Sequence, residues 1–268
     1  MTTNEDFRIS NTGTARVYRE LVRRHVMDAE AVSEMCGGTR RARDVMYTLV
    51  RRGLAVRVHR GLYGAVPIEY EGEYHEIDRF VIAHAAGGGG ALAYHSALEL
   101  HGVAQSHFNT VYYARRRPLR GFEFQGAEYV FVSTKSLFGT VEVWREGAKV
   151  PVTDRERTFL DCLRRMDYCG GPEEFIKSVQ GFHVLDFKNL GNHLRKFGER
   201  SLYQKAGYML TLLRDDFKPP EDFLRELKKK VGRKPCYLLQ RPAAGAGRFV
   251  GEWNLVVPDN IEELMRFV

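Results

Sequence analysis

Residues 39–66, TRRARDVMYTLVRRGLAVRVHRGLYGAV, contain the pattern that decides the fold of the N-terminal region. In the first half of this stretch, the apolar residues recur at helical spacing and form one stripe: Ala42, Val45, Met46, Leu49 and Val50. The opposite face of such a helix carries Arg40, Asp44, Tyr47 and Arg51, with Arg41, Arg43 and Thr48 at its margins. We therefore expect an amphipathic helix whose outer face is rich in arginine.

The same stretch predicts the limits of this helix and a β-hairpin after it. Thr39 is the expected N-cap, and Gly53 is the expected end of the helix. Residues 55–59 alternate between apolar and basic side chains, which is typical of a strand with one face in water. Gly61 permits a sharp turn, and residues 62–63 begin a return strand.

Two shorter segments precede this stretch. Residues 13–26 have apolar side chains at helical spacing, and Asp28 is the expected N-cap of a short helix over residues 29–35. Gly37 and Gly38 then provide a tight turn between two helices. The order of helix, short helix, glycine turn, Arg-rich helix and hairpin predicts a winged helix-turn-helix domain over residues 1–70.

The net charge is concentrated in the same region. The whole chain has 41 Lys and Arg against 34 Asp and Glu, for a formal charge of +7. Residues 1–60 contain 12 Arg, no Lys and seven acidic residues, a net of +5, so the remaining 208 residues contribute only +2. A compact basic unit is typical of proteins that bind a polyanion such as nucleic acid.

Double-stranded DNA is the polyanion that this arrangement favours. An α-helix fits the major groove, where Arg can form two hydrogen bonds with guanine O6 and N7, and a wing contacts phosphates or the minor groove. The residues assigned to DNA are Thr39, Arg40, Arg41, Arg43, Asp44 and Tyr47 on the helix, and Arg57, His59 and Arg60 on the hairpin. Two alternatives stay open: the arginines only solvate a helix face, or the winged helix contacts protein.

Residues 71–268 are expected to form a second domain of mixed α/β composition, which makes the predicted class of the chain α+β. The acidic segment 67–74 joins the two domains, and a helix is expected over residues 75–86. The second domain is predicted to be β-rich over residues 90–150 and helical over residues 153–232, with closing strands over residues 235–257.

Histidines and cysteines show no catalytic or metal-binding pattern. His95, His101 and His107 are spaced six residues apart, whereas metal-binding helices place their ligands three or four residues apart. Partly buried or capping histidines are the expectation instead. Cys162 lies beside an apolar helix stripe, so we expect it in the core.

Acidic residues show no catalytic or metal-binding pattern either. Thr153 matches the N-cap of a helix, and Glu156 completes a capping box with it. A nucleotidyltransferase needs Gly-Ser followed by an Asp-x-Asp pair that holds metal ions, and neither pattern occurs in the sequence. We therefore expect no catalytic residue, no metal, no cofactor and no enzymatic activity.

Two further basic clusters lie outside the N-terminal region. Arg115, Arg116, Arg117 and Arg120 form a second candidate DNA contact. Residues 228–230 are three lysines at the end of a predicted helix, where cations suit the helix dipole.

Composition excludes several protein classes. With 44% hydrophobic and 28% charged residues, the chain is an ordinary globular protein rather than a disordered one. It has no run of about 18 apolar residues that could span a membrane, and no apolar segment of a secretory signal in its first 20 residues. From the lack of such a run we expect no membrane partner. The four cysteines lie far apart, which favours a reducing cytoplasm.

Several segments together resemble the AbiEi-like antitoxin family, described as transcriptional regulators of viral defence systems. LVRRGLAVRVHRGLYGAVP (49–67) resembles the helix end and wing of that family, and AYHSALELHGV (93–103) resembles its strand–helix segment. VTDRERTFLDCLRR (152–165) followed by GGPEEF (170–175), and the closing EWNLVVP (252–258), are similar as well. The matches run in order over residues 15–257.

The resemblance implies a winged-helix domain joined to an α/β antitoxin domain. Such proteins are encoded beside a nucleotidyltransferase-like toxin in abortive phage infection, a type IV toxin–antitoxin system. They repress their own operon by binding inverted repeats, and they neutralise the toxin. The matching DNA-reading positions are Arg40, Arg41, Arg43 and Tyr47, with Arg57 and Arg60 on the wing. The family implies no catalytic residue, and it offers no counterpart for Arg115–Arg117.

Two other functions are kept as alternatives to this autorepressor and antitoxin. The mixed α/β pattern of the second domain is compatible with a nucleic-acid-processing enzyme. The winged helix is compatible with a protein-interaction module that does not bind DNA.

Overall fold

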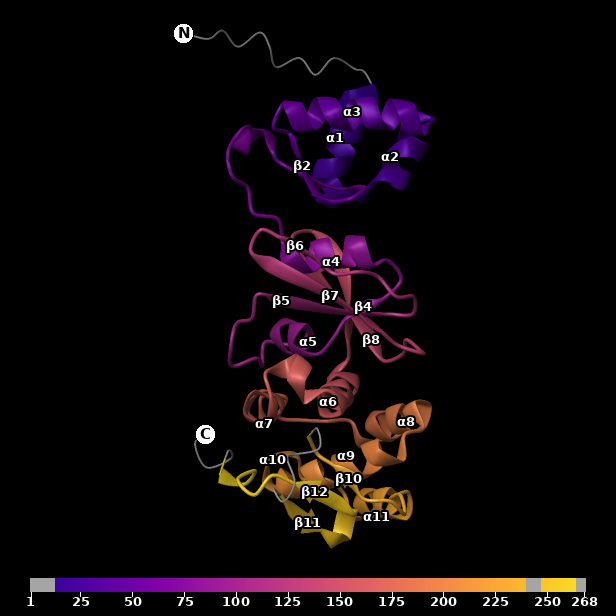
Figure 1. Ribbon diagram of the computed structural model, residues 1–268, viewed down its shortest axis with the longest axis vertical. Helices are drawn as coiled ribbons and strands as arrows, with labels where there is room; N and C mark the ends of the chain where they lie inside the picture. Colours follow the sequence, from indigo (N-terminus) through magenta and orange to yellow (C-terminus); the bar gives the residue numbers. More distant parts are fainter. Residues whose placement is uncertain (1–12, 240–246, 264–268) are drawn as a thin grey trace. The chain divides into compact units, whose positions relative to one another are not determined.

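The computed structural model describes residues 13–239 and 247–263, and within them it combines helices with two three-stranded sheets and one six-stranded sheet (Figure 1). The predicted α+β class is confirmed at this level. The chain separates into two compact units. Unit 1 comprises the chain up to Gly90 together with residues 109–134 and 142–151, and unit 2 comprises the rest. Unit 1 runs past residue 70, and the domain boundary expected there stays a prediction.

Unit 1 begins with three helices and three short strands. They are α1 (Gly13–Arg24), β1 (Val26–Asp28), α2 (Ala29–Cys36), α3 (Thr39–Arg51), β2 (Ala55–His59) and β3 (Leu62–Ala65). Their buried side chains form one core to which all three helices contribute, including Leu21, Val32, Met46 and Leu49. The strands form a sheet of order β1-β3-β2, in which Arg57 lies opposite Tyr63 and Met27 lies opposite the same tyrosine on the other side.

The predicted helix ends are confirmed in one case and wrong in another. Asp28 caps α2, where its Oδ1 accepts a hydrogen bond of 2.7 Å from the N–H of Ala31. Thr39, however, is the first residue of α3, and Gly38 takes the N-cap position with a φ of 152°. Val50 was predicted on the buried stripe but is 39% exposed, because it lies at the edge of that stripe.

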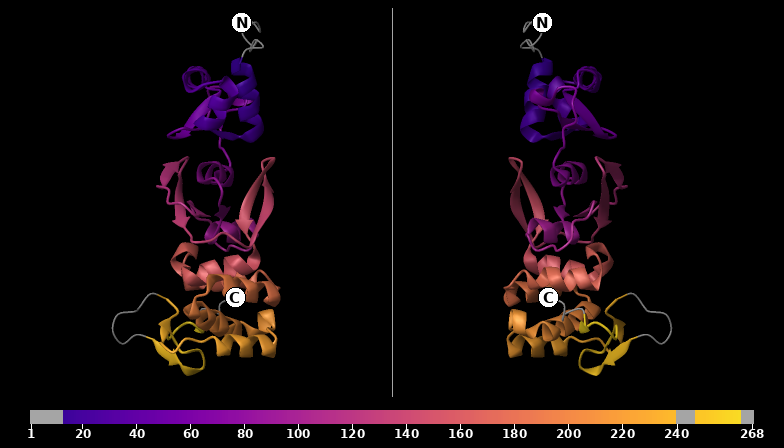
Figure 2. Two further views of the ribbon diagram at one scale, coloured as in Figure 1. Left: turned by 90° about the vertical axis from the view of Figure 1, so that its right-hand side faces the viewer. Right: turned by 90° about the vertical axis from the view of Figure 1, so that its left-hand side faces the viewer.

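The remainder of unit 1 is a helix packed against strands. It contains a short 3-10 turn (Ile68–Tyr70), α4 (Arg79–Gly87), β5 (Thr110–Arg115), β6 (Phe122–Phe124) and β7 (Ala127–Ser133). The strands β8 (Thr140–Arg145) and β9 (Ala148–Thr153) follow along the chain. Figure 2 shows α4 end-on, with strands on both of its sides. β5 runs parallel to β7, and β6 runs antiparallel to it.

The helix expected over residues 75–86 begins later than predicted. Asp78 caps α4, and its Oδ1 accepts hydrogen bonds of 2.9 and 3.0 Å from the N–H groups of Phe80 and Val81. Residues 75–78 are not helical, because their backbone bonds to Gln125: its Oε1 accepts from the N–H of Ile77, and its Nε2 donates to the carbonyl of His75. Phe80 and Val81 are buried on the helix that forms, but the first turn expected from residue 75 is absent.

Unit 2 is mainly helical. It contains β4 (Ala91–Leu92), α5 (His95–Leu100), α6 (Arg155–Arg164), a 3-10 turn (Met166–Cys169), α7 (Pro172–Gln180), α8 (Phe187–Phe197), α9 (Arg200–Leu212), α10 (Arg214–Phe217) and α11 (Glu221–Lys229). It closes with β10 (Cys236–Tyr237), β11 (Arg248–Val250), a 3-10 turn (Gly251–Trp253) and β12 (Leu255–Val257), in the order β10-β12-β11. No helix within the described ranges is long and apolar enough to cross a bilayer.

The capping box predicted for α6 is wrong by one residue. Asp154 is the N-cap, and its Oδ1 accepts a hydrogen bond of 2.7 Å from the N–H of Arg157. The hydroxyl of Thr153 instead pairs with that of Thr158 at 2.7 Å. Glu156 reaches α8, where its Oε1 accepts from the N–H of Asp186 at 2.9 Å.

One ion pair is buried in α6. Nε of Arg157 donates to Oδ2 of Asp161 at 2.8 Å, and both side chains are at most 2% exposed. The guanidinium carbon lies 4.1 Å from the ring centre of Phe138 and 4.2 Å from that of Phe197, so the cation also sits between two aromatic faces. Burial raises the pKa of Asp161 above its ordinary value even though Arg157 opposes the change.

We predict that Asp161→Ala lowers the free energy of unfolding by about 3–5 kcal/mol, because it leaves a buried guanidinium without its counter-charge. Equilibrium unfolding in urea measures this loss. The double variant R157M/D161L, which removes both charges, is expected to be closer to wild type than the single variant. A single variant as stable as wild type would contradict the prediction.

We also predict that the Asp154 carboxylate contributes stability that is lost in acid. Burial raises its pKa, but hydrogen bonds from His193 and from the N–H of Arg157 outweigh burial, and the net pKa lies below its ordinary value. The contribution is therefore complete above the unfolded pKa of about 3.9 and disappears as pH falls through the lower folded pKa. Urea unfolding between pH 5 and 2 should show a shallower decline for Asp154→Asn than for wild type. Asp215→Asn, at an exposed position, is the matched control.

Candidate nucleic-acid interface

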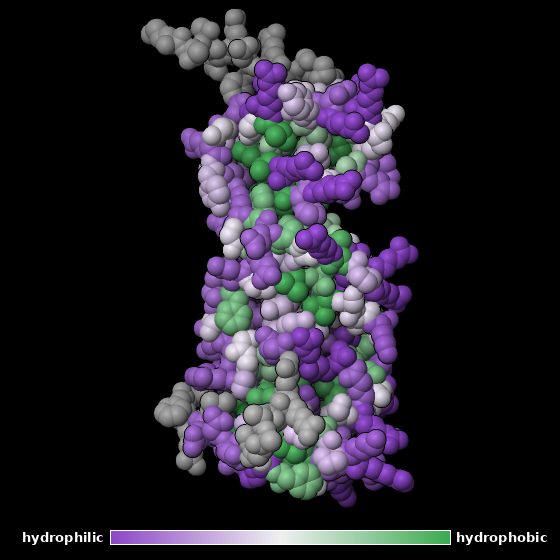
Figure 3. Space-filling model, in the orientation of Figure 1, coloured by the Kyte–Doolittle hydropathy of each residue, from purple (hydrophilic) through white to green (hydrophobic). Residues whose placement is uncertain are grey.

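Helix α3 presents its predicted polar face to solvent. The buried stripe of Ala42, Val45, Met46 and Leu49 fixes the rotation of the helix about its axis. The six residues predicted to contact DNA from this helix are all exposed: Thr39, Arg40, Arg41, Arg43, Asp44 and Tyr47. Tyr47 is 66% exposed, which is unusual for an aromatic side chain of its size. In Figure 3, hydrophilic side chains cover the part of the surface that α3 occupies in Figure 1.

The glycine turn before α3 leaves its first N–H groups available. Gly37 has a φ of 71°, in the left-handed region, and ends α2. Gly38 has no side chain, so it caps α3 without a side-chain hydrogen bond. The positive end of the helix dipole thus lies beside Arg40, Arg41 and Arg43, where cations oppose rather than favour helix stability. An anion bound at this end would relieve the repulsion.

The arginines of α3 also lack internal counter-charges. Within the described residues, no ion pair joins Arg40, Arg41 or Arg43 to an acidic side chain. On α1, by contrast, Glu20 lies 2.5 Å from atoms of both Arg23 and Arg24. Hydrogen bonds from these two arginines lower the pKa of Glu20 to about 2. Two of the four arginines of α1 therefore have an acidic partner within their own helix.

Three of the four α3 arginines lie in its N-terminal half, and they differ in direction. Arg40 lies at the centre of the face opposite the apolar stripe, whereas Arg41 and Arg43 lie at its margins. The guanidinium of Arg41 extends back towards Gly13 at the start of α1, where a Cβ would lie 3.5 Å from Nη2. Arg40 is therefore the arginine of the three that points most directly away from the core.

The hairpin places all three of its predicted contacts in solvent. Arg57, His59 and Arg60 are exposed, and the turn at Gly61 is held by a 2.7 Å hydrogen bond from the N–H of Ala29 to its carbonyl. The ring of His59 stacks on that of Phe122 in β6, with centroids 4.6 Å apart and planes at 13°. This stack occupies one face of the His59 ring, which the sequence pattern did not indicate.

The other basic cluster belongs to the loop between β5 and β6. Arg115 ends β5 and is half-buried, whereas Arg116, Arg117 and Arg120 are exposed. The loop lies in unit 1, which also contains α3 and the hairpin.

The three histidines tested in the sequence do not all lie at one site, but two of them share a carboxylate. His95 is buried, where its Nδ1 lies 2.9 Å from Oε1 of Glu99 and its ring stacks on Phe108. Nδ1 of His107 lies 3.8 Å from Oε2 of the same glutamate. His101 Nε2 bonds to the carbonyl of Thr153 at 2.7 Å, while His107 is exposed. In residues 13–239 and 247–263, no group of three or more His, Cys, Asp or Glu is placed to hold a metal ion.

Cys162 is fully buried, as predicted for a core residue, and burial raises the pKa of its thiol. A thiol in this position is poorly suited to act as a nucleophile.

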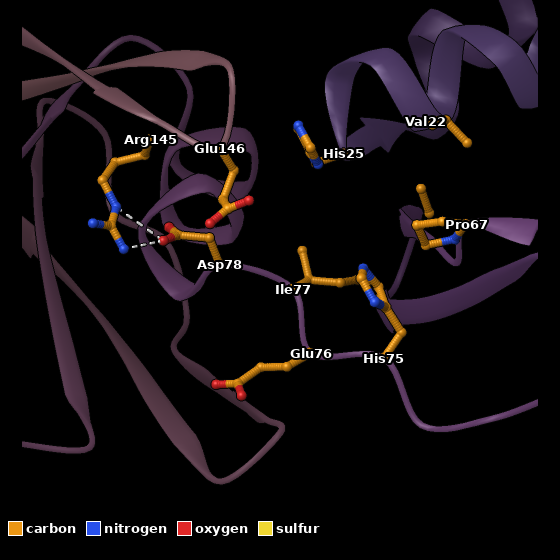
Figure 4. A pocket seen from close by; sticks show the side chains of 10 residues that line it. Val22, His25, Pro67, His75, Glu76, Ile77, Asp78, Arg145 and Glu146 are labelled. Carbon is orange, nitrogen blue, oxygen red and sulfur yellow. Dashed lines mark hydrogen bonds and ion pairs between the residues drawn. The ribbon is translucent and has the colours of Figure 1, made fainter. Parts of the chain in front are cut away.

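Unit 1 also contains a cavity that sequence reasoning missed (Figure 4). Its volume is about 440 Å³, and its polar lining includes His25, His75, Glu76 and Glu146. Arg145 also lines it, but its Nε and Nη2 lie 2.9 and 2.5 Å from Oδ2 of Asp78, so that charge is already paired. The lining comes from segments more than 100 residues apart, and no local pattern could indicate it.

Comparison with known proteins shows a likeness in fold alone. No protein-family model matches the chain, and no curated protein matches it in sequence. Among solved structures, the chain is similar to the Rv2827c protein from Mycobacterium tuberculosis, with a TM-score of 0.62 and 17% sequence identity. The match covers 95% of this chain and 94% of that chain, so the likeness extends over both units.

Proposed function

We propose that residues 13–66 form a winged helix-turn-helix that binds double-stranded DNA in a sequence-specific manner. The observation that carries the proposal is the exposed face of α3, where arginines without acidic partners lie opposite a buried apolar stripe. The order of α2, the glycine turn, α3 and the β2–β3 hairpin supports it, because this is the element order of such domains.

In the proposed complex, α3 lies in the major groove with its N-terminal half against the bases. Arg40 forms two hydrogen bonds with O6 and N7 of a guanine, and Asp44 accepts a hydrogen bond from the amino group of a cytosine. Arg41 and Arg43, at the margins of the face, contact phosphates together with Arg57 and Arg60 of the hairpin. Phosphate contacts supply affinity and base contacts supply sequence preference.

We further propose that the chain is a non-enzymatic autorepressor and antitoxin of the AbiEi-like kind. This part of the proposal is supported by the ordered resemblance of residues 49–67, 93–103, 152–175 and 252–258 to that family. Its partners would be an operator with inverted repeats and a nucleotidyltransferase-like toxin. Unit 2, which contains most of the later matching segments, is the proposed antitoxin part.

We predict that Arg40→Ala weakens binding to the DNA upstream of the chain's own gene by about 1–3 kcal/mol and relaxes its sequence preference, because a two-bond contact with guanine is lost. Fluorescence anisotropy with that duplex and with an unrelated duplex of equal length measures both effects. Lys229→Ala, which removes one exposed cation of unit 2, is the control for net charge.

The outcome that would reject specific DNA binding is equal affinity of the wild-type protein for the two duplexes at physiological salt. Retention of full preference by Arg40→Ala would reject only the assignment of Arg40 as a base contact.

For the antitoxin role, we predict that co-expression of the full chain restores growth of cells that express the nucleotidyltransferase-like protein implied by the resemblance. Arg40→Ala should restore growth equally well, because the proposed antitoxin part lies outside α3. Colony counts with and without induction of the toxin measure the effect. Failure of the wild-type chain to restore growth would contradict the role.

A further inference from the structure

We propose that the β5–β6 loop, residues 115–120, is a second phosphate-binding surface that lengthens the contact of unit 1 with duplex DNA beyond α3 and the hairpin. This inference rests on the proposed function and extends it to a segment outside the helix-turn-helix region.

The loop is unusually basic for its length. Its sequence from residue 115 to residue 121 is RRRPLRG, which contains four arginines and no acidic residue. Arg116, Arg117 and Arg120 are exposed. Within the described part of the chain, no hydrogen bond or ion pair ties any of these three guanidinium groups to a carboxylate. Some exposed arginines elsewhere have such a partner, as Arg165 has in Asp167 at 2.7 Å.

Both ends of the loop are held by the fold. At its start, the N–H of Thr134 donates to the carbonyl of Arg115 at 2.8 Å, which continues the pairing of β5 with β7. At its end, the backbone of Gly121 lies against β7 so closely that a Cβ would come within 2.5 Å of the carbonyl oxygen of Tyr129. Pro118 restricts the backbone between these points. The three cations are therefore presented on a loop with little freedom to lose on binding.

A stack of three rings connects the loop to the hairpin. Phe122, two residues after Arg120, lies between the rings of His59 and Tyr129, with centroid distances of 4.6 Å on both sides. Arg60 follows His59 directly in the chain, and Arg120 precedes Phe122 by two residues. The stack in this way joins the hairpin to the segment that follows the basic loop, within unit 1.

The composition of the loop favours a phosphate backbone over a protein partner. Protein interfaces contain apolar or aromatic side chains that become fully buried at their centre. Here only two apolar side chains lie among the exposed cations, those of Pro118 and Leu119, and both are exposed. Three unpaired guanidinium groups without an apolar centre match a row of phosphates, where each contact releases condensed counterions.

The test is a salt series on the full-length protein. The variant R116A/R117A/R120A and wild type are titrated with a 40-base-pair duplex from upstream of the gene and with an unrelated duplex of equal length. Each lost phosphate contact should reduce the slope of log K against log salt by about 0.9, and the three together by about 2.7. The ratio of the two affinities should stay near that of wild type, because phosphate contacts do not read sequence.

Two further variants separate charge at the loop from other effects. K229A/K230A/R233A removes three exposed cations from unit 2 and should retain the wild-type slope. R116K/R117K/R120K keeps the charges and should recover most of the slope lost in the alanine variant. Circular dichroism and thermal unfolding establish that each variant is folded.

Hydroxyl-radical footprinting on the upstream duplex gives a second readout. The alanine variant should lose protected sugar positions at one edge of the footprint and keep those at its centre. A wild-type slope with the alanine variant, or an equal loss of slope with the unit 2 control, would overturn the inference and leave the proposed function intact. Absence of DNA binding by the wild-type protein would instead overturn the proposed function itself.

Discussion

The rotation of α3 about its own axis is the constraint on which the rest of unit 1 depends. Ala42, Val45, Met46 and Leu49 pack into the core shared with α1 and α2, and no other orientation of the helix would bury all four. Once this face is buried, Arg40 and Tyr47 must lie in solvent. The apolar side chains thereby determine which charges are available to a partner, although none of them would touch it.

The distribution of counter-charges adds to this geometric constraint. Where the fold needs arginine for its own stability, it supplies an acid: Glu20 for α1, Asp161 for α6 and Asp78 for β8. The arginines of α3 and of the β5–β6 loop have no such partner in the described residues. Since cations near a helix start reduce its stability, Arg40, Arg41 and Arg43 do not stabilise α3.

Sequence patterns predicted the elements well and their ends less well. The periodicity around Leu49 and Val58 identified α3 and β2, because burial of one face is a strong and repeated signal. The N-cap of a helix depends on a single residue, and neighbouring residues can often take the same position. Gly38 rather than Thr39 takes the N-cap position of α3, because the left-handed turn places the glycine at the junction. Asp154 rather than Thr153 takes the N-cap position of α6, because its carboxylate is the stronger hydrogen-bond acceptor.

Contacts between distant segments could not be predicted at all. The stack of His59 on Phe122 joins positions 63 residues apart, and the cavity lined by His25 and Glu146 joins positions still further apart. Neither has a local pattern, since each partner is ordinary in its own segment. The residues of the candidate site and their exposure to solvent could therefore be predicted from the sequence. The contact between the hairpin and β6 could be seen only in the structure.

Asp78 shows how one side chain can make two parts of a fold cooperative. Its Oδ1 caps α4 and its Oδ2 holds Arg145 at the end of β8, while the side chain itself is only 7% exposed. Fraying of the first turn of α4 would leave Arg145 with a displaced partner, and opening of the β8 end would leave a buried carboxylate half satisfied. The helix start and the strand end therefore form a single opening unit, and amide protons in the two segments should exchange with solvent at linked rates.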